Sequence, residues 1–268
     1  MIEKDFILLI PHFNNYAGLI NSIKSVQYQN NRFEILIVDD GSDIPLDNQT
    51  LQEFNPNIHL IRLPKNLGVL KALNTGLAYL QSRNDFKYIA RLDCGDICHP
   101  DRFNKQVTFL DEHPEISLLG TWCHFIEKTS KKNYLYKTKI KHNDILKEMH
   151  YKCSFIHPTV MFRKEILEKI GYYPNGFIHA EDYAYFWMIL KKMKGEILPK
   201  VLVDIEYSTN NISAIYYKKQ LKSKIKITIK FGDNLFLIIL GLYFKLIRFL
   251  IPLRTISYFK FSKKNYDS

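Results

Sequence analysis

The sequence contains little cysteine, and its few cysteines are scattered. Only four occur in 268 residues: Cys94, Cys98, Cys123 and Cys153, with no C-x-x-C pair among them. A structural zinc site would need ligands that this spacing does not supply. A chain of this length with so few cysteines is also no disulfide scaffold, so we expect free thiols in a reducing compartment.

Glycine-rich phosphate-binding loops are missing as well. The apolar residues 6–11 lead into His12-Phe13-Asn14-Asn15. This segment matches neither the G-x-G-x-x-G turn of dinucleotide-dependent dehydrogenases nor the basic, glycine-rich loop expected of a nucleotidyltransferase. The N-terminus has no basic region followed by a long apolar core, so we expect no secretory signal peptide. We find no internal repeat and no low-complexity stretch.

The net charge of +11 is concentrated at one end of the chain. Residues 214–268 hold 12 of the 38 Lys and Arg residues but only 2 of the 27 Asp and Glu residues, which places a net charge of +10 there. The remainder is nearly neutral, and its 46% hydrophobic content is typical of a folded core. Because the excess charge lies in an apolar-rich tail, we expect no nucleic-acid partner.

Strand and helix patterns alternate through the first two thirds of the chain. Continuous apolar runs predict buried strands at residues 6–11, 33–38, 58–63 and 88–92, and residues 117–126, 155–162 and 197–207 also resemble strands. Apolar residues at helical spacing lie between the early runs, and residues 181–193 predict a later helix. We therefore expect an α/β fold with a mainly parallel, twisted sheet flanked by helices.

Acidic residues follow two of these strands and begin the later helix. Asp39 and Asp40 close the second strand, Asp93 and Asp96 follow the fourth, and Asp182 lies in the first turn of the helix. A single acid at such a position is usually a cap or turn residue. Three acidic groups together favour a ligand site, because ligands bind outside the carboxyl ends of strands in open α/β sheets.

Six blocks of the sequence resemble glycosyltransferase family 2, which has the GT-A fold. They are residues 10–14 (IPHFN), 35–42 (ILIVDDGS), 66–76 (NLG and ALNTG), 88–103 (YIARLD and PDRF), 157–163 (HPTVMFR) and 180–183 (AEDY). Each block alone is weak, but their order and spacing match the family over about residues 5–207. The resemblance implies an inverting glycosyltransferase of bacterial surface-polysaccharide or lipopolysaccharide biosynthesis.

The resemblance also implies site residues and partners. Pro11, His12 and Phe13 would line the base and ribose pocket, Asp40 would accept from the base, Asn66 and Gly68 would shape the nucleotide pocket, Asp93 would begin the metal motif, and Asp182 would be the general base. The donor would be a nucleotide sugar, by family habit a UDP-hexose or UDP-N-acetylhexosamine. The acceptor would be a hydroxyl of a glycan or lipid-linked molecule at the cytoplasmic face of the inner membrane.

The turn after the fourth strand departs from the family pattern. The usual motif is Asp-x-Asp-Asp, whereas this chain has Asp93-Cys94-Gly95-Asp96. Asp93 and Asp96 can hold Mg²⁺ or Mn²⁺ together with water and the donor phosphates, with Cys94 contacting the donor through its backbone. Alternatively, metal binding is weak and Arg91 or Lys71 meets part of the charge. A degenerate, non-catalytic glycan-binding or scaffold protein is the runner-up function.

We expect two parts in the chain. Residues 1–213 would form the GT-A domain, and residues 214–268 would form a basic amphipathic extension. The uninterrupted apolar stretch at residues 235–244 is too short to span a bilayer, which takes about 20 residues. Lys245 and Arg248 would share a face with Gly241, and Pro252 would stop the helix. These features favour a helix lying in the membrane interface. The alternative is a helix packed on the catalytic domain or on a partner subunit.

Overall fold

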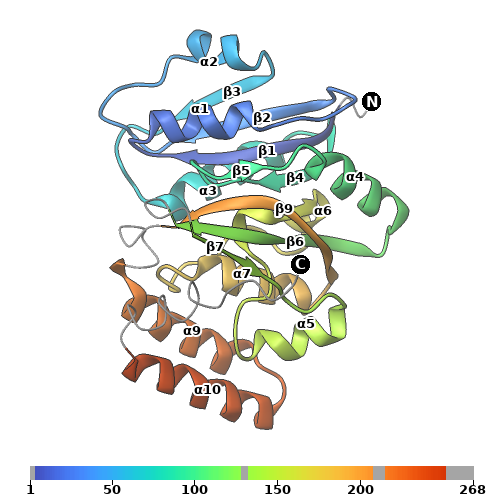
Figure 1. Ribbon diagram of the computed structural model, residues 1–268, viewed down its shortest axis with the longest axis vertical. Coiled ribbons are helices and arrows are strands. Elements are labelled where there is room, and N and C mark those ends of the chain that lie inside the picture. The colour runs from blue at the N-terminus through green and yellow to red at the C-terminus, as the bar shows by residue number, and fades with distance from the viewer. Residues whose placement is uncertain (1–3, 128–131, 208–214, 252–268) are drawn as a thin grey trace.

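The computed structural model describes residues 4–127, 132–207 and 215–251. A nine-stranded sheet runs through the molecule, with helices packed on both faces (Figure 1). The strands are β1 (Lys4–His12), β2 (Phe33–Asp39), β3 (Ile58–Arg62), β4 (Phe86–Arg91), β5 (Ile97–Cys98), β6 (Ile116–Glu127), β7 (Asn133–Tyr136), β8 (Met161–Arg163) and β9 (Lys194–Tyr207). The helices are α1 (Tyr16–Lys24), α2 (Asn48–Phe54), α3 (Val69–Gln81), α4 (Arg102–Glu112), α5 (His142–Met149), the 3₁₀ turn η1 (His157–Thr159), α6 (Glu165–Lys169), α7 (Glu181–Leu190), α9 (Tyr217–Phe231) and α10 (Leu235–Leu250).

The sheet is parallel in its N-terminal half and mixed beyond it. Its order is β3-β2-β1-β4-β8-β6-β9-β5, with β7 paired to β6. Strands β3, β2, β1 and β4 are parallel neighbours, so their carboxyl ends meet at one edge. β8 runs antiparallel to both β4 and β6, whereas β6 and β9 are again parallel. The expected parallel arrangement is therefore found in β1 to β4. The antiparallel pairs of β8 with β4 and β6 make the complete sheet a mixed one.

Alternating side chains on β1 explain the layered core. Phe6, Leu8 and Ile10 pack into one apolar cluster, with residues of α1 and α4. Ile7 and Leu9 point to the opposite face and join a second cluster, with residues of α3 and α7. All five side chains are fully buried. A strand covered on both faces must be apolar at every position, which is why the continuous run was a sound strand signal.

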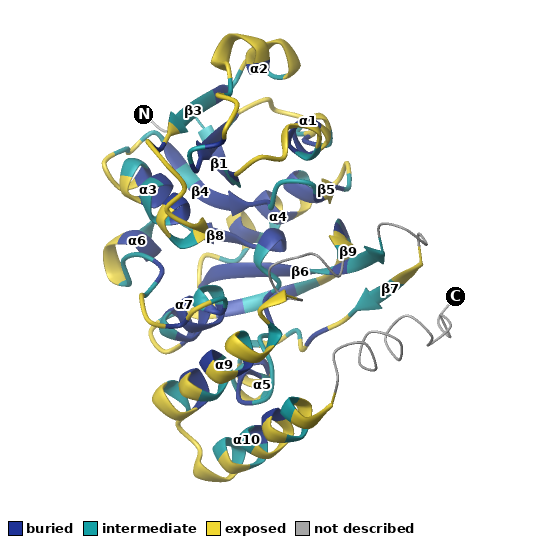
Figure 2. Cartoon of the chain, turned by 90° about the vertical axis from the view of Figure 1, so that its left-hand side faces the viewer, coloured by how far each residue is buried: buried dark blue, intermediate teal, exposed yellow. Residues whose placement is uncertain are grey.

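The two C-terminal helices pack beside α7 and α5 at one end of the molecule (Figure 1). α10 meets the rest of the protein through Gly241 and Lys245, its two buried residues, and Figure 2 shows that most of its length is exposed. Lys245 therefore packs against the protein, whereas Arg248 and most of the large apolar side chains of α10 are exposed. None of the helices in the described ranges is long and apolar enough to cross a bilayer. The stop expected at Pro252 lies outside the described residues.

Candidate active site

The loop after β2 is held by a buried His–Asp–Ser cluster. Asp39 Oδ1 accepts a hydrogen bond from Ser42 Oγ at 2.5 Å and lies 3.1 Å from His12 Nδ1. The backbone N–H of Asn15 donates to His12 Nε2 at 3.2 Å, so both ring nitrogens of His12 are engaged. Register pairing places His12 directly beside Asp39 at the ends of β1 and β2. The cluster therefore fixes the shape of both loops at the carboxyl edge.

Asp40 joins the loop after β2 to the turn before α3. Its Oδ1 accepts from the backbone N–H of Leu67 at 2.9 Å, and its Oδ2 accepts from that of Gly68 at 2.8 Å. Asn66 also accepts from Gly68 through its side-chain oxygen. Gly41 has a φ of +71° and lies so close to Lys65 that a Cβ there would be 2.3 Å from its carbonyl carbon. Only glycine fits that position without displacing the backbone.

The residues expected to line the nucleotide pocket differ in exposure. Pro11 is half-buried, His12 is buried, and Phe13 keeps 42% of its surface exposed. Asn66 and Gly68 are exposed, whereas Asp40 is buried with both oxygens bonded to backbone. These residues come together at the ends of β1, β2 and β3. The side chains available to a ligand there are those of Phe13 and Asn66, while His12 and Asp40 shape the loops behind them.

Arg91 anchors the acidic turn that follows β4. Its side chain is fully buried and donates from Nη1 to the carbonyls of Leu9 at 2.9 Å and Leu92 at 2.8 Å. Nη2 donates to Asp93 Oδ1. Burial alone would raise the pKa of Asp93, but attraction from neighbouring groups, chiefly Arg91, outweighs it and lowers that pKa. Asp93 is therefore held as a carboxylate, with 43% of its side chain exposed.

Asp96 is the second acid of this turn. It is buried, and its Oδ1 accepts from the backbone N–H of Glu206 on β9 at 3.1 Å. Burial, together with the nearby charge of Asp93, raises the pKa of Asp96 well above its usual range. The two acids of the turn thus lie in different environments. In the described parts of the chain, no group of three or more His, Cys, Asp or Glu side chains is arranged to hold a metal ion.

Gly95 and Cys94 complete the turn between these acids. Gly95 has a φ of +106°, which disfavours any side chain, and its N–H donates to Ser22 Oγ at 2.9 Å. The Cys94 thiol donates to the carbonyl of Asn15 at 3.3 Å. Burial, with Asp93 adding to it, raises the pKa of Cys94 to about 12, so the thiol stays protonated. The backbone conformation therefore accounts for glycine where the family pattern has an acid.

His157 contributes to the site more than its sequence context indicated. The sequence favoured a packed strand residue, but His157 lies in the turn η1, with its Nε2 2.8 Å from Tyr173 Oη and 3.1 Å from Arg91 Nε. Burial, and then the charge of Arg91, lowers the pKa of His157 to about 3, so the ring is neutral. The chain thereby gains a buried Arg91–His157–Tyr173 network behind Asp93. The sequence signal was the histidine before Pro158.

Asp182 lies in the first turn of α7. Burial raises its pKa to about 6; the neighbouring charges of Glu181 and Asp93 add to the rise, while a backbone hydrogen bond and Lys224 oppose it. Asp93 and Asp182 are therefore close enough for their charges to interact. Lys224 comes from α9, so the C-terminal extension also reaches this carboxylate. The sequence did not single out Lys224, which looked like one of many tail lysines.

The loop before Asp182 is held by α9. Gln220 donates to the carbonyl of His179 at 2.8 Å, and Ser223 donates to that of Ile178 at 2.9 Å. His179 has a positive φ of 61°, which is uncommon for a residue other than glycine. Its ring stacks on Tyr216 at a centroid distance of 4.4 Å. Helix α9 thus fixes the backbone that positions Asp182.

Comparison with known proteins gives a consistent set of similarities. The profile of Glycosyl transferase family 2 matches residues 7–171. An uncharacterized glycosyltransferase of Haemophilus influenzae is 33% identical over 175 residues, 63% of this chain and 62% of that protein. The amylovoran biosynthesis glycosyltransferase AmsE of Erwinia amylovora is 31% identical over 170 residues, 63% of this chain and 61% of that protein. The UDP-Gal:alpha-D-GlcNAc-diphosphoundecaprenol beta-1,3-galactosyltransferase of Escherichia coli is 30% identical over 179 residues, 65% of this chain and 63% of that protein.

Solved structures match nearly the whole chain at low sequence identity. TarS residues 1–349 of S. aureus, in complex with UDP-GlcNAc, aligns with a TM-score of 0.62 at 17% identity and covers 97% of this chain and 76% of that one. The mannosyltransferase PcManGT of Pyrobaculum calidifontis, in complex with GDP-Man and Mn²⁺, aligns with a TM-score of 0.61 at 14% identity and covers 94% and 72%. These similarities confirm the GT-A fold. The first curated relatives align over about three fifths of their own length.

Proposed function

The chain belongs to glycosyltransferase family 2, and we propose from this premise that it transfers a sugar from a nucleotide-sugar donor to an acceptor hydroxyl. One observation carries the proposal. Asp93 follows β4 and Asp182 begins α7; their charges interact, and their pKa values shift in opposite directions. Two acids with different pKa values are suited to two roles: one can bind a cation and the other can accept a proton.

Asp182 is the general base of this reaction. The acceptor hydroxyl attacks the anomeric carbon of the donor, and its proton passes to the Asp182 carboxylate. The bond between the anomeric carbon and the phosphate oxygen breaks, and the nucleoside diphosphate leaves. The configuration at the anomeric carbon of the transferred sugar is inverted. Because the displacement is direct, the chain needs no covalent nucleophile. A base whose pKa is raised to about 6 by burial is well matched to deprotonation near neutral pH.

Asp93 is the residue we assign to a divalent cation, Mg²⁺ or Mn²⁺. Arg91 donates to Oδ1 of Asp93. Because the Asp93 side chain remains partly exposed, its Oδ2 is available as a hard ligand. Asp96 fits a second ligand poorly, since its carboxylate is buried against β9. The remaining ligands would be donor phosphates and water, as Mg²⁺ commonly accepts. A bound cation would offset the charge of the departing diphosphate.

The donor site in this proposal lies at the loops of β1, β2 and β3. Pro11, Phe13 and Asn66 border the base and ribose, while Asp40 and Gly68 hold the turn against which they lie. Cys94 contacts the donor through its backbone. The nucleotide is UDP and the sugar a hexose or N-acetylhexosamine, supported by the galactosyltransferase relative and by the UDP-GlcNAc complex of a structural neighbour. The GDP-Man complex of another neighbour makes GDP-mannose the competing donor.

The acceptor in this proposal is a glycan or a lipid-linked molecule at the cytoplasmic face of the inner membrane, in surface-polysaccharide synthesis. The curated relatives that act in amylovoran synthesis and on a diphosphoundecaprenol acceptor support this assignment. Residues 1–213 form the catalytic domain, and residues 214–268 form the extension that contacts the membrane. The exposed apolar side of α10 supports that contact; its residues are Leu235, Phe236, Ile239, Tyr243, Leu246 and Leu250.

Donor hydrolysis by the purified chain tests the function directly. A panel of UDP- and GDP-linked sugars is incubated with the protein with and without Mn²⁺, and release of the nucleoside diphosphate is measured. We expect metal-dependent release from one nucleotide sugar above all others. Failure to hydrolyse or bind any member of the panel would favour the non-catalytic scaffold, for which the glycine at position 95 is the one supporting feature in the sequence.

A further inference from the structure

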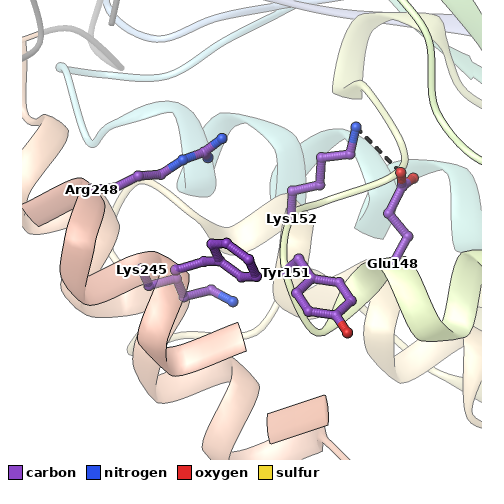
Figure 3. A pocket seen from close by; sticks show the side chains of 6 residues that line it. Glu148, Tyr151, Lys152, Lys245 and Arg248 are labelled. Carbon is purple, nitrogen blue, oxygen red and sulfur yellow. Dashed lines mark ion pairs between the residues drawn. The ribbon is translucent and has the colours of Figure 1, made fainter. Parts of the chain in front are cut away.

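A cavity of about 190 Å³ lies between α10 and the segment that includes and follows α5. Six side chains line it: Glu148, Tyr151, Lys152, Phe244, Lys245 and Arg248. Figure 3 shows Lys245 and Arg248 projecting from α10 on the side of Tyr151 and Lys152. Three of the six are cations and one is an acid. We call this cavity the cationic pocket.

The single acid of the cationic pocket already has a counter-ion. Glu148 lies 3.3 Å from Lys152 Nζ and accepts from Ser154 Oγ at 2.8 Å and from the backbone N–H of Lys139 at 3.0 Å. Among the residues that the structure describes, neither Lys245 nor Arg248 forms an ion pair. Lys245 Nζ donates to the carbonyl of His150 at 2.5 Å, and that carbonyl carries no formal charge. The pocket therefore has two basic side chains without a counter-ion.

Burial makes this excess charge costly. Lys245 is almost fully buried, and burial lowers its pKa to about 7, with the charges of Lys224 and Arg248 lowering it further. Like charges held together in a partly dry site repel each other unless an anion binds between them. A phosphate group offers several oxygens to Arg and Lys donors and would remove this repulsion.

The position of the cationic pocket connects it to the candidate base. The charge of Lys224 on α9 interacts with that of Asp182 and also with those of Lys245 and Arg248. Phe244 borders the pocket, is partly exposed and is the next residue after Tyr243 of the exposed apolar side. A ligand extending along this path would place a hydroxyl near Asp182, an anion at the cations of α10 and an apolar group along that helix.

We propose that the cationic pocket binds the phosphate of a lipid-linked sugar acceptor, with Arg248 and Lys245 as its ligands. This assignment rests on the glycosyltransferase function proposed above and specifies its acceptor class. The extension is then part of the acceptor site as well as a membrane contact. Lys224, whose charge interacts with both Asp182 and Arg248, is suited to orient the acceptor.

The proposal is tested by measuring the binding of farnesyl diphosphate to the full chain with isothermal titration calorimetry. Inorganic pyrophosphate is the second probe, because it carries the anion without the lipid. Arg248→Gln removes an exposed cation and should leave the fold intact; Lys245→Met removes the buried one. Lys200→Gln, at an exposed lysine of β9 outside the pocket lining and outside α9 and α10, is the matched control for charge.

We expect the unaltered chain and Lys200→Gln to bind farnesyl diphosphate equally and more tightly than pyrophosphate. Arg248→Gln should weaken that binding by about tenfold or more. No binding by the unaltered chain, or equal binding by Arg248→Gln, would overturn the proposal. Pyrophosphate binding as tight as that of farnesyl diphosphate would overturn the lipid-linked assignment in favour of a free phosphate. Donor hydrolysis by the unaltered chain is scored separately, so failure of the function is distinguishable from failure of the pocket.

Discussion

Burial of the Asp182 carboxylate has a kinetic consequence at the scale of a single residue. Its pKa rises to about 6, so the base form is lost as the pH falls through that value. Turnover should therefore fall about tenfold per pH unit below pH 6 and level off above pH 7. Initial rates measured between pH 4.5 and 8 at saturating donor and metal test this. A flat profile down to pH 4.5 would contradict the assignment of Asp182 as base.

Replacing the base gives a second test of the same residue. Asp182→Asn keeps the shape of the side chain but cannot accept the proton, so we expect kcat to fall by about 100- to 10,000-fold. Asp101→Asn is the matched control, because Asp101 is exposed and pairs only with Lys105 in the described structure. Turnover of Asp182→Asn within a factor of a few of the control would rule out general-base catalysis by this residue.

Asp93 should control the metal requirement. Asp93→Ala removes the one exposed carboxylate of the turn and leaves the buried Arg91 without its ion pair. We expect turnover to fall by about a hundredfold or more at any Mn²⁺ concentration. EDTA should likewise stop turnover by the unaltered chain, and added Mn²⁺ should restore it. Full activity in chelator would remove the metal role and leave Arg91 and Lys71 as the charge-bearing alternatives.

At the scale of elements, the sequence was informative where structure is local. The apolar runs of β1, β2 and β4 are buried on both faces, so composition alone located them. The sequence did not predict α2 and α5, because these short helices lack a long apolar stripe. It also did not separate the strand β8 from the turn at His157-Pro158. The orientation of Asp96 depends on β9, which lies far away in the sequence. The charge interaction of Lys224 with Asp182 likewise requires α9 to pack beside α7.

Helix α10 shows how one small residue sets the packing of an element. A Cβ on Gly241 would lie 2.1 Å from the carbonyl oxygen of His150. Gly241→Ala should therefore lower the free energy of unfolding by about 1–3 kcal/mol, although alanine favours the helix itself by about 1 kcal/mol. Urea denaturation measures the difference, with the exposed Ile239→Ala as control. A gain in stability would show that α10 does not dock through Gly241.

At the scale of the whole molecule, charge and apolar surface gather on the same end. The exposed lysines of α9, among them Lys218, Lys222 and Lys226, lie on the helix beside the exposed apolar side of α10. Because Lys245 of α10 is buried, lipid headgroups would meet chiefly the α9 lysines while the apolar α10 side chains enter the acyl boundary. This arrangement predicts binding that needs both an anionic surface and an apolar contact.

Sedimentation with vesicles tests that arrangement. The chain should bind vesicles of phosphatidylcholine mixed with phosphatidylglycerol, bind phosphatidylcholine alone more weakly, and be partly released by high salt. Ile239→Asp with Leu246→Asp places two charges on the apolar side and should abolish the binding. Ile44→Asp, at an 82% exposed isoleucine far from α10 in the loop after β2, should leave binding unchanged. Equal sedimentation of all three chains would show that α10 is no membrane contact, because an apolar surface that enters lipid cannot tolerate two carboxylates without a measurable loss.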